Sequence, residues 1–288
     1  MIVIAGPTSQ PSTGDAPPGE PVHDDGDDVP TPGDPGPRAI ETALERSTRT
    51  PGSARGGSHR PEGEITAMFD EIAPVYDRLN TIMTFGLDRR WRAAAVAASK
   101  VGPGDAAIDV AAGTGKLAGA LADRVGPFGR VAAVDLSPGM VARGRAATSD
   151  LVQLEFVVGN ALALPFEDGR FDAATIAFGL RNLSDFGAGF REMRRVVRPG
   201  GRVVCLELTL PRPRWWGRVY QVGFGRLAPL AGSIAGRREM YAYLPASLVG
   251  FPDAEQLARL MVEAGLVDVT VRRFGLGAVA LHTGRAPG

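Results

Sequence analysis

The pattern of apolar and polar positions changes sharply near residue 63. From residue 64 to 98, apolar side chains recur at helical spacing, with a break near Thr84 to Gly86, which predicts two or three helices. Beyond Pro103, short apolar runs alternate with helical patterns, as in a parallel sheet covered on both faces. The last two runs, 266–274 and 278–283, are joined by a glycine-containing turn and predict an antiparallel edge.

The alternation gives specific elements. The expected strands are AAIDVA, RVAAVDLS, LEFVVGN, RFDAATIAFGL and RVVCLELTL. The expected helices are KLAGALADRV, PGMVARGRAAT and FGAGFREMRRVVR, the last ended by Pro199-Gly200-Gly201. By contrast, residues 1–62 are rich in Pro, Gly, Asp, Ser and Thr and cannot bury enough apolar surface to offset the entropy of ordering. We therefore expect residues 1–62 to be a disordered tail and residues 63–288 to be one folded domain.

Charge, cysteine content and hydropathy exclude several classes of protein. The chain has 288 residues with 32 Lys and Arg against 32 Asp and Glu, so nucleic acid is not an expected partner. Cys205 is the single cysteine, which excludes an intrachain disulfide and a cysteine-rich metal site. The sequence has no apolar run long enough to span a membrane, and its first residues lack the basic region of a signal peptide. We expect a soluble cytoplasmic protein.

The strongest local motif is the glycine loop between the strand at 106–111 and the following helix. It reads Asp109-Val110-Ala111-Ala112-Gly113-Thr114-Gly115, whose small residues let a ligand approach the backbone and the free N–H groups of the helix. Asp135 ends the next strand, where a carboxylate can accept hydrogen bonds from both hydroxyls of a ribose. Residues 113–118 also satisfy G-x-G-x-x-G/A, so the loop fits NAD as well as S-adenosylmethionine. A tight turn with no ligand is a third interpretation.

Neighbouring residues favour S-adenosylmethionine. Asp109 lies at the mouth of the loop, and a carboxylate suits a cationic sulfonium and ammonium better than bare N–H groups do. Asn160 and Ala161 follow the third strand, where an amide side chain and a backbone N–H could read adenine. The passage from Pro165 to Asp172 has a Pro-Phe…Phe-Asp pattern that is common in S-adenosylmethionine-dependent methyltransferases. Asp172 by itself is better interpreted as a turn or cap residue.

Four stretches resemble one family. They are MFDEIAPVYDRLNTIMTFGLDRRWR, AFGLRNLSD, EMRRVVRPGGRVVCLELTLP, and YAYLPASLVGFPDAEQLARLMVEAGL with GAVALHTG. They resemble the ubiquinone/menaquinone biosynthesis C-methyltransferase family over roughly residues 64–285. The resemblance implies a Rossmann-like class I S-adenosylmethionine-dependent methyltransferase, with a mostly parallel seven-stranded sheet, an antiparallel edge and helices on both faces. It also implies methylation of the ring of a reduced polyprenyl quinol, most closely demethylmenaquinol to menaquinol.

The chain departs from the family pattern at several positions. Lys116 stands where the family usually has Asp, and Asp88 stands where it often has His. Thr84 replaces Ser, and Ala177 replaces a Ser that contacts the cofactor in the family. The resemblance therefore implies no cofactor contact at Ala177. With the chemistry of the loop, the expected cofactor site comprises Asp109, Gly113, Thr114, Gly115, Asp135, Asn160 and Ala161, with no metal.

Methyl transfer from a sulfonium needs alignment and exclusion of water rather than a metal or a protein nucleophile. A phenolate must develop on the quinol, so a nearby acceptor and a cation are expected. Arg181, in the family-like FGLRN segment, could hold the quinol oxygen or form a structural ion pair, and Glu207 could pair with an Arg or bind substrate. Tyr76 and Asp77 could close over the cofactor, although Asp77 could instead cap a helix. His282 and Cys205 are expected to be structural.

Aromatic and arginine residues alternate over residues 212–230. We expect a lid over an isoprenoid tail that also makes peripheral contact with the inner face of the membrane, or else a helical pair packed on the sheet. The expected parts are helices at 63–100, a cofactor-binding core at 101–210, a helical lid or insert at 211–250, and a helix with hairpin strands at 251–288. Three alternatives stay open: methylation of another quinol or a phospholipid, a nicotinamide-dependent oxidoreductase, and non-catalytic binding of S-adenosylmethionine.

Overall fold

The computed structural model describes residues 2–3, 62–73, 77, 81, 84, 86–209 and 250–288. Its α-helices are α2 (Glu62–Ile72), α4 (Asp88–Ser99), α5 (Lys116–Val125), α6 (Pro138–Ala147), α7 (Phe186–Val196) and α10 (Ala254–Glu263). Two short 3-10 helices are η1 (Leu180–Asn182) and η2 (Gly275–Gly277). The strands are β1 (Ile2–Val3), β2 (Ala106–Val110), β3 (Arg130–Asp135), β4 (Leu154–Val158), β5 (Phe171–Ala177), β6 (Val197–Leu208), β7 (Val267–Phe274) and β8 (Val279–Arg285).

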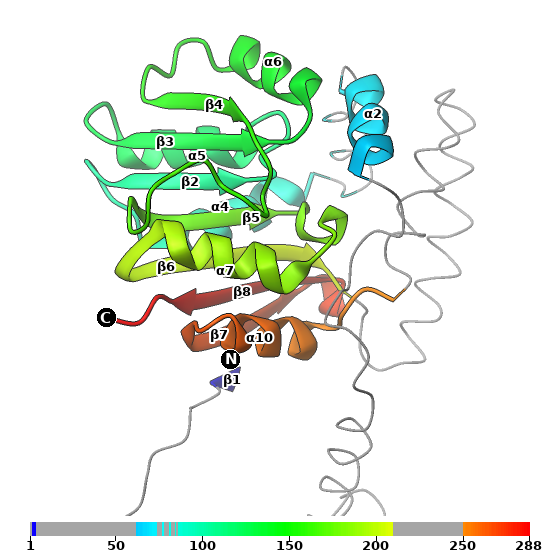
Figure 1. The fold of residues 1–288 in the computed structure, drawn as a ribbon, viewed down its shortest axis with the longest axis vertical. Coiled ribbons are helices and arrows are strands. Elements are labelled where there is room, and N and C mark those ends of the chain that lie inside the picture. The colour runs from blue at the N-terminus through cyan, green and yellow to red at the C-terminus, as the bar shows by residue number, and fades with distance from the viewer. Residues whose placement is uncertain are drawn as a thin grey trace, which may run out of the picture. The chain divides into compact units, whose positions relative to one another are not determined.

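All these strands form one sheet, in the order β1-β7-β8-β6-β5-β2-β3-β4. Strands β6, β5, β2, β3 and β4 run parallel to one another, whereas β8 is antiparallel to both β6 and β7. The chain winds from β2 outward through β3 to β4, and then returns to β5 on the other side of β2 (Figure 1). This reversal is the topological switch point, where folds of this kind bind ligands at the carboxyl ends of the strands.

Local sequence explains where several helices begin. The N–H group of Met140 donates to the Ser137 side chain at the start of α6, whose first residue is a proline. The Asp185 carboxylate accepts from the N–H of Ala188 at the start of α7. At α10, Asp253 and Gln256 form a reciprocal capping box. These caps satisfy backbone donors that a helix leaves without internal partners.

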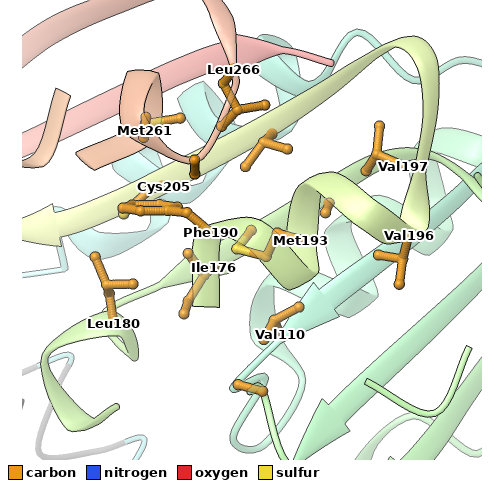
Figure 2. Close-up of a cluster of buried hydrophobic side chains, with 14 of the residues drawn as sticks. Val110, Ile176, Leu180, Phe190, Met193, Val196, Val197, Cys205, Met261 and Leu266 are labelled. Atoms are coloured by element: carbon orange, nitrogen blue, oxygen red, sulfur yellow. The ribbon is translucent and has the colours of Figure 1, made fainter. Parts of the chain in front are cut away.

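Buried apolar side chains form a layer on each face of the sheet. One layer lies under α7 and α10, which stand in front of the sheet in Figure 1. Figure 2 shows part of this layer, with Phe190 and Met193 of α7 beside Cys205 of β6 and Met261 of α10. The second layer packs α4 and α5 on the opposite face. Cys205 is fully buried, and burial raises the pKa of its thiol, so it is a core residue as expected.

The seven-stranded, mostly parallel sheet with an antiparallel edge is confirmed, and β1 adds a two-residue strand beside β7. Of the expected tail, the structure describes Ile2–Val3, in that strand, and Glu62, the first residue of α2. The predicted end of the helix at 186–198 was wrong by two residues. The helix ends at Val196 because Val197 already pairs with Phe171 in the sheet.

The expected lid falls outside the described residues, apart from Gly250. In the part of the chain that the structure describes, no helix is long and apolar enough to cross a membrane.

Candidate active site

A pocket opens at the carboxyl ends of β2, β3, β4 and β5, next to the topological switch point. Its walls come from the loops after these strands, from the start of α6 and from α2, which lies beyond the arrowheads of β3 and β4 in Figure 1. The lining residues are Ile65, Thr66, Phe69, Ala111, Gly113, Asp135, Leu136, Ser137, Met140, Gly159, Asn160, Ala161, Phe178, Gly179, Asn182 and Leu183. Four of the seven predicted cofactor residues are among them.

Asp135 is held in place by backbone donors on both carboxylate oxygens. The N–H of Gly113 donates to Oδ2 at 2.7 Å, and the N–H of Ser137 donates to Oδ1 at 2.9 Å. Burial raises the pKa of Asp135 above its ordinary value, while these two hydrogen bonds oppose that rise. The carboxylate therefore joins the glycine loop to the start of α6 and is fixed at the wall of the pocket.

Asp109 is not among the residues that line the pocket. It is only 1% exposed, and the Thr175 hydroxyl donates to its Oδ1 at 2.7 Å. Burial raises the pKa of Asp109 to about 7, against the lowering effects of Thr175 and the nearby charge of Arg92. Asp109 is thus a carboxyl group whose charge near neutral pH depends on what lies beside it.

The glycine loop turns between β2 and α5. Gly113 and Gly115 both adopt positive φ, at 57° and 79°, a region that glycine enters without steric cost. A Cβ on Gly115 would also lie 2.4 Å from the Phe156 ring. Both the backbone conformation and this close contact therefore favour glycine at position 115. Thr114 is buried, and its hydroxyl donates to Asp77 Oδ1 at 2.7 Å. Thr114 and Gly115 therefore shape the loop without lining the pocket.

Asn160 and Ala161 line the pocket after β4. The Asn160 side-chain oxygen accepts from the N–H of Leu162 at 2.9 Å, which closes a tight local turn. Both residues share the pocket lining with Gly113 and Asp135. Their reading of adenine stays a prediction.

Arg181 and Glu207 form a buried ion pair. Arg181 is 6% exposed and Glu207 is 0% exposed, and the guanidinium Nη1 lies 2.7 Å from Glu207 Oε1. The same Nη1 donates to the carbonyl of Phe178 at 2.7 Å. Arg181 does not line the pocket, although its neighbour Asn182 does. Of the two interpretations of Arg181, the geometry matches the structural ion pair.

The other predicted residues have clear places. Asp77 accepts from Thr114 and lies 3.5 Å from the ammonium of Lys116, so it contacts the cofactor loop, whereas Tyr76 lies outside the described residues. His282 is buried against the carbonyl of Ala254 at 2.8 Å, and burial lowers its pKa, as expected for a structural histidine.

Asp172, which the sequence suggests is a turn or cap residue, accepts from the N–H of Ala106 at 2.8 Å and forms an ion pair with Arg198. The carboxylate therefore ties the beginning of β5 to β2 and β6, well away from the pocket lining.

Sequence reasoning missed the contribution of α2 and of Phe178. The helix was expected, but nothing local showed that Ile65 and Phe69 would face the pocket. Phe178 holds an unusual positive φ of 59° for a bulky residue and lies 5.3 Å from the Arg92 guanidinium, measured to the ring centroid. Ser137 was detectable, because a serine before a proline is a typical helix start.

The doubly wound sheet, the glycine loop after its first central strand and the acid at the end of the next define a class I S-adenosylmethionine-dependent methyltransferase. A SAM-dependent methyltransferase from Aquifex aeolicus aligns with a TM-score of 0.50 and 17% identity, covering 68% of this chain and 89% of that chain. The [4+2]-cyclase SpnF aligns with a TM-score of 0.55 and 19% identity, covering 77% and 95%. At these identities the likeness establishes the fold alone.

The family is established by sequence. Residues 58–286 match the ubiE/COQ5 methyltransferase family, and this chain belongs to it. It is 40% identical over 223 residues to the ubiquinone/menaquinone biosynthesis C-methyltransferase UbiE of Geobacter sulfurreducens, covering 76% of this chain and 87% of that protein. It is 39% identical over 222 residues to a demethylmenaquinone methyltransferase of Staphylococcus aureus, covering 77% and 92%. The predicted methyltransferase and its cofactor, S-adenosylmethionine, are thereby confirmed, and the nicotinamide alternative is set aside.

Proposed function

We propose that this chain transfers a methyl group from S-adenosylmethionine to a ring carbon of a reduced polyprenyl quinol, and that demethylmenaquinol is its acceptor in menaquinone biosynthesis. One observation carries the choice of acceptor. Relatives named demethylmenaquinone methyltransferase match this chain over 92% of their own length, so the likeness extends well beyond the shared cofactor fold.

The chemistry of the pocket fits the cofactor. Asp135 in the wall supplies negative charge that suits a cofactor with a sulfonium and an ammonium group, and the buried carboxyl of Asp109 adds to this charge when it is ionised. We propose that Asp135 accepts from the ribose hydroxyls, since its oxygens are already oriented by Gly113 and Ser137. Asn160 and Ala161 would hold the adenine on the other side of the pocket.

When bound, the cofactor supplies an electrophilic methyl group, and the chain's own residues align it and exclude water. Apolar side chains from two separate elements close the pocket: Ile65 and Phe69 from α2, and Phe178 and Leu183 from either side of η1. A dry pocket strengthens each electrostatic contact and protects the reacting atoms from solvent.

On the acceptor side, we propose that Arg181 is a positioning residue and that Asn182 contacts the quinol. The charge of Arg181 is already neutralised by Glu207, so it is a poor partner for a phenolate. Through its bonds to Glu207 and to the Phe178 carbonyl, Arg181 fixes η1 and so presents Asn182 to the pocket. The Asn182 amide can hydrogen-bond a quinol hydroxyl as that hydroxyl loses its proton.

A polyprenyl acceptor resides in lipid, so we propose that this methyltransferase works in the cytoplasm at the inner face of the membrane. The segment expected to make that contact, 212–230, lies outside the described residues. Co-sedimentation of the full chain with anionic vesicles tests the proposal, and a chain that stays in the supernatant at low salt would contradict it.

The proposed acceptor is tested by methyl transfer with purified protein and S-adenosylmethionine. Four acceptors are compared: chemically reduced short-chain demethylmenaquinol, its oxidised form, a benzoquinol that lacks the ring methyl group, and phosphatidylethanolamine. We expect the gain of one methyl group, read by product mass, with the reduced demethylmenaquinol and none with its oxidised form. Faster turnover of the benzoquinol or of the phospholipid would overturn the proposed acceptor.

A further inference from the structure

We propose that α2 is a cover over the cofactor pocket, and that two aspartates, Asp70 and Asp77, hold this cover closed by binding the first turns of α6 and α5. The inference rests on the assignment of the pocket to the cofactor. Ile65, Thr66 and Phe69 of the cover line the same pocket as Gly113 and Asp135 of the core.

The cover has its own small apolar contact with the core. Phe69 and Ala73 pack against Met140 of α6 in a cluster separate from the two layers that surround the sheet. Among the residues that the structure describes, this cluster is small and contributes limited stabilisation. The polar fastenings therefore have a large share in deciding how often α2 leaves the pocket.

The first fastening is Asp70 at the start of α6. Its Oδ1 accepts from the Ser137 hydroxyl and, at 2.8 Å, from the N–H of Gly139. The Ser137 oxygen in turn accepts from the N–H of Met140, so the carboxylate completes the cap of α6. The positive end of the helix dipole favours a negative charge here. A Cβ on Gly139 would lie 2.8 Å from the same carboxylate oxygen, so the approach of Asp70 depends on a glycine.

The second fastening is Asp77 at the start of α5. Its Oδ1 accepts from the Thr114 hydroxyl at 2.7 Å and lies 3.5 Å from the Lys116 ammonium. The ammonium also lies 3.4 Å from the Asp77 carbonyl oxygen and from the Thr81 hydroxyl. Lys116, one of the residues that depart from the family pattern, thus connects the cofactor loop to Asp77 and Thr81.

Both fastenings can open. Asp70 is exposed, and the side chains of Asp77 and Lys116 are 34% and 32% exposed, so water and salt compete for each contact. Thr114 follows Gly113, whose N–H donates to Asp135. The contact of Asp77 with Thr114 therefore lies on the glycine loop of the proposed cofactor site. Because α2 lines the pocket, its detachment widens the exit for the product cofactor, and each carboxylate slows release by holding α2 in place.

The test measures dissociation of S-adenosylhomocysteine from the full chain, without any quinol, by stopped-flow displacement. The variants are Asp70→Asn, Asp77→Asn and Lys116→Met. Glu64→Gln is the matched control, since Glu64 is exposed on the same helix. We expect about tenfold faster dissociation in each aspartate variant, about threefold in Lys116→Met, and no change in the control or in Lys116→Arg.

Hydrogen exchange on the bound proteins separates the cover from general destabilisation. We expect faster exchange confined to the amides of α2 in Asp70→Asn, with the sheet unchanged. Dissociation rates equal to those of Glu64→Gln would overturn the proposal, as would faster exchange spread evenly over α2 and the sheet. Because no acceptor is present, the dissociation rates do not depend on which quinol the enzyme uses. Likewise, a negative result for the cover would not change the outcome of the methyl-transfer assay.

Discussion

The two sides of the pocket are built differently. On the cofactor side, Gly113, Asp135 and Asn160 are held by hydrogen bonds within or between neighbouring strand-to-helix loops. On the proposed acceptor side, η1 is held by a buried ion pair between Arg181 and Glu207, which come from different strand ends. The first side depends on hydrogen bonds between side chains and the backbone of these loops, and the second depends on one ion pair out of water. A change on the first side is therefore expected to weaken cofactor binding, whereas loss of one charge on the second side is expected to destabilise the whole fold as well.

Glu207→Gln has the largest expected effect. It leaves the Arg181 guanidinium buried without a counter-ion, which typically costs about 3–5 kcal/mol of the free energy of unfolding. We expect urea unfolding to show a loss in this range, together with loss of methyl transfer. The double variant Arg181→Met/Glu207→Gln removes the buried charge and should recover most of the stability. A stable Glu207→Gln protein that lacks only activity would instead give Arg181 a direct catalytic role.

Asp135→Ala comes next. It removes the acceptor of two backbone N–H groups and the proposed acceptor of the ribose hydroxyls. We expect binding of S-adenosylmethionine, measured by calorimetry, to weaken on the order of 100-fold, as for the loss of two charge-assisted hydrogen bonds. Asp172→Ala is a matched control, because that carboxylate ties strands together outside the pocket lining. Equal weakening in both variants would contradict the assignment of Asp135.

Asp109→Asn should increase the stability of the fold at high pH and should weaken binding of the cationic cofactor there. Burial raises the pKa of Asp109 to about 7, so its stabilising contribution is complete below the ordinary pKa and is lost as pH rises to about 7. The variant cannot ionise, so its advantage in stability over the parent should grow by about 2–3 kcal/mol between pH 5 and pH 8. Thermal unfolding over this pH range measures the difference.

Binding gives an independent reading of the same group. The parent should bind the cationic cofactor less tightly below pH 7, where Asp109 is protonated, and this dependence should vanish in Asp109→Asn. Calorimetric titrations at pH 6 and pH 8 measure it. A parent affinity that does not change between these pH values would place Asp109 outside the electrostatic environment of the cofactor.

The same division explains what the sequence could predict. The glycine loop, Asp135 and Asn160 each sit at a fixed offset from a strand, so alternation and spacing place them correctly. The family-like segments add FGLRN and the position of Glu207. Nothing local could pair Arg181 with Glu207 over 26 residues, or Asp70 with Ser137 over 67 residues, because those contacts depend on how the sheet is wound. The strand at Ile2–Val3 was missed for the same reason, since its partner is near the other end of the chain.

The central claim is that this chain methylates carbon rather than oxygen on a reduced quinol. The most direct measurement uses S-adenosylmethionine labelled with carbon-13 in its methyl group and reduced demethylmenaquinol, followed by NMR of the extracted product. We expect a labelled methyl group bonded to a ring carbon. A labelled methoxy group, or label confined to unreacted cofactor while S-adenosylmethionine is shown to bind, would contradict it.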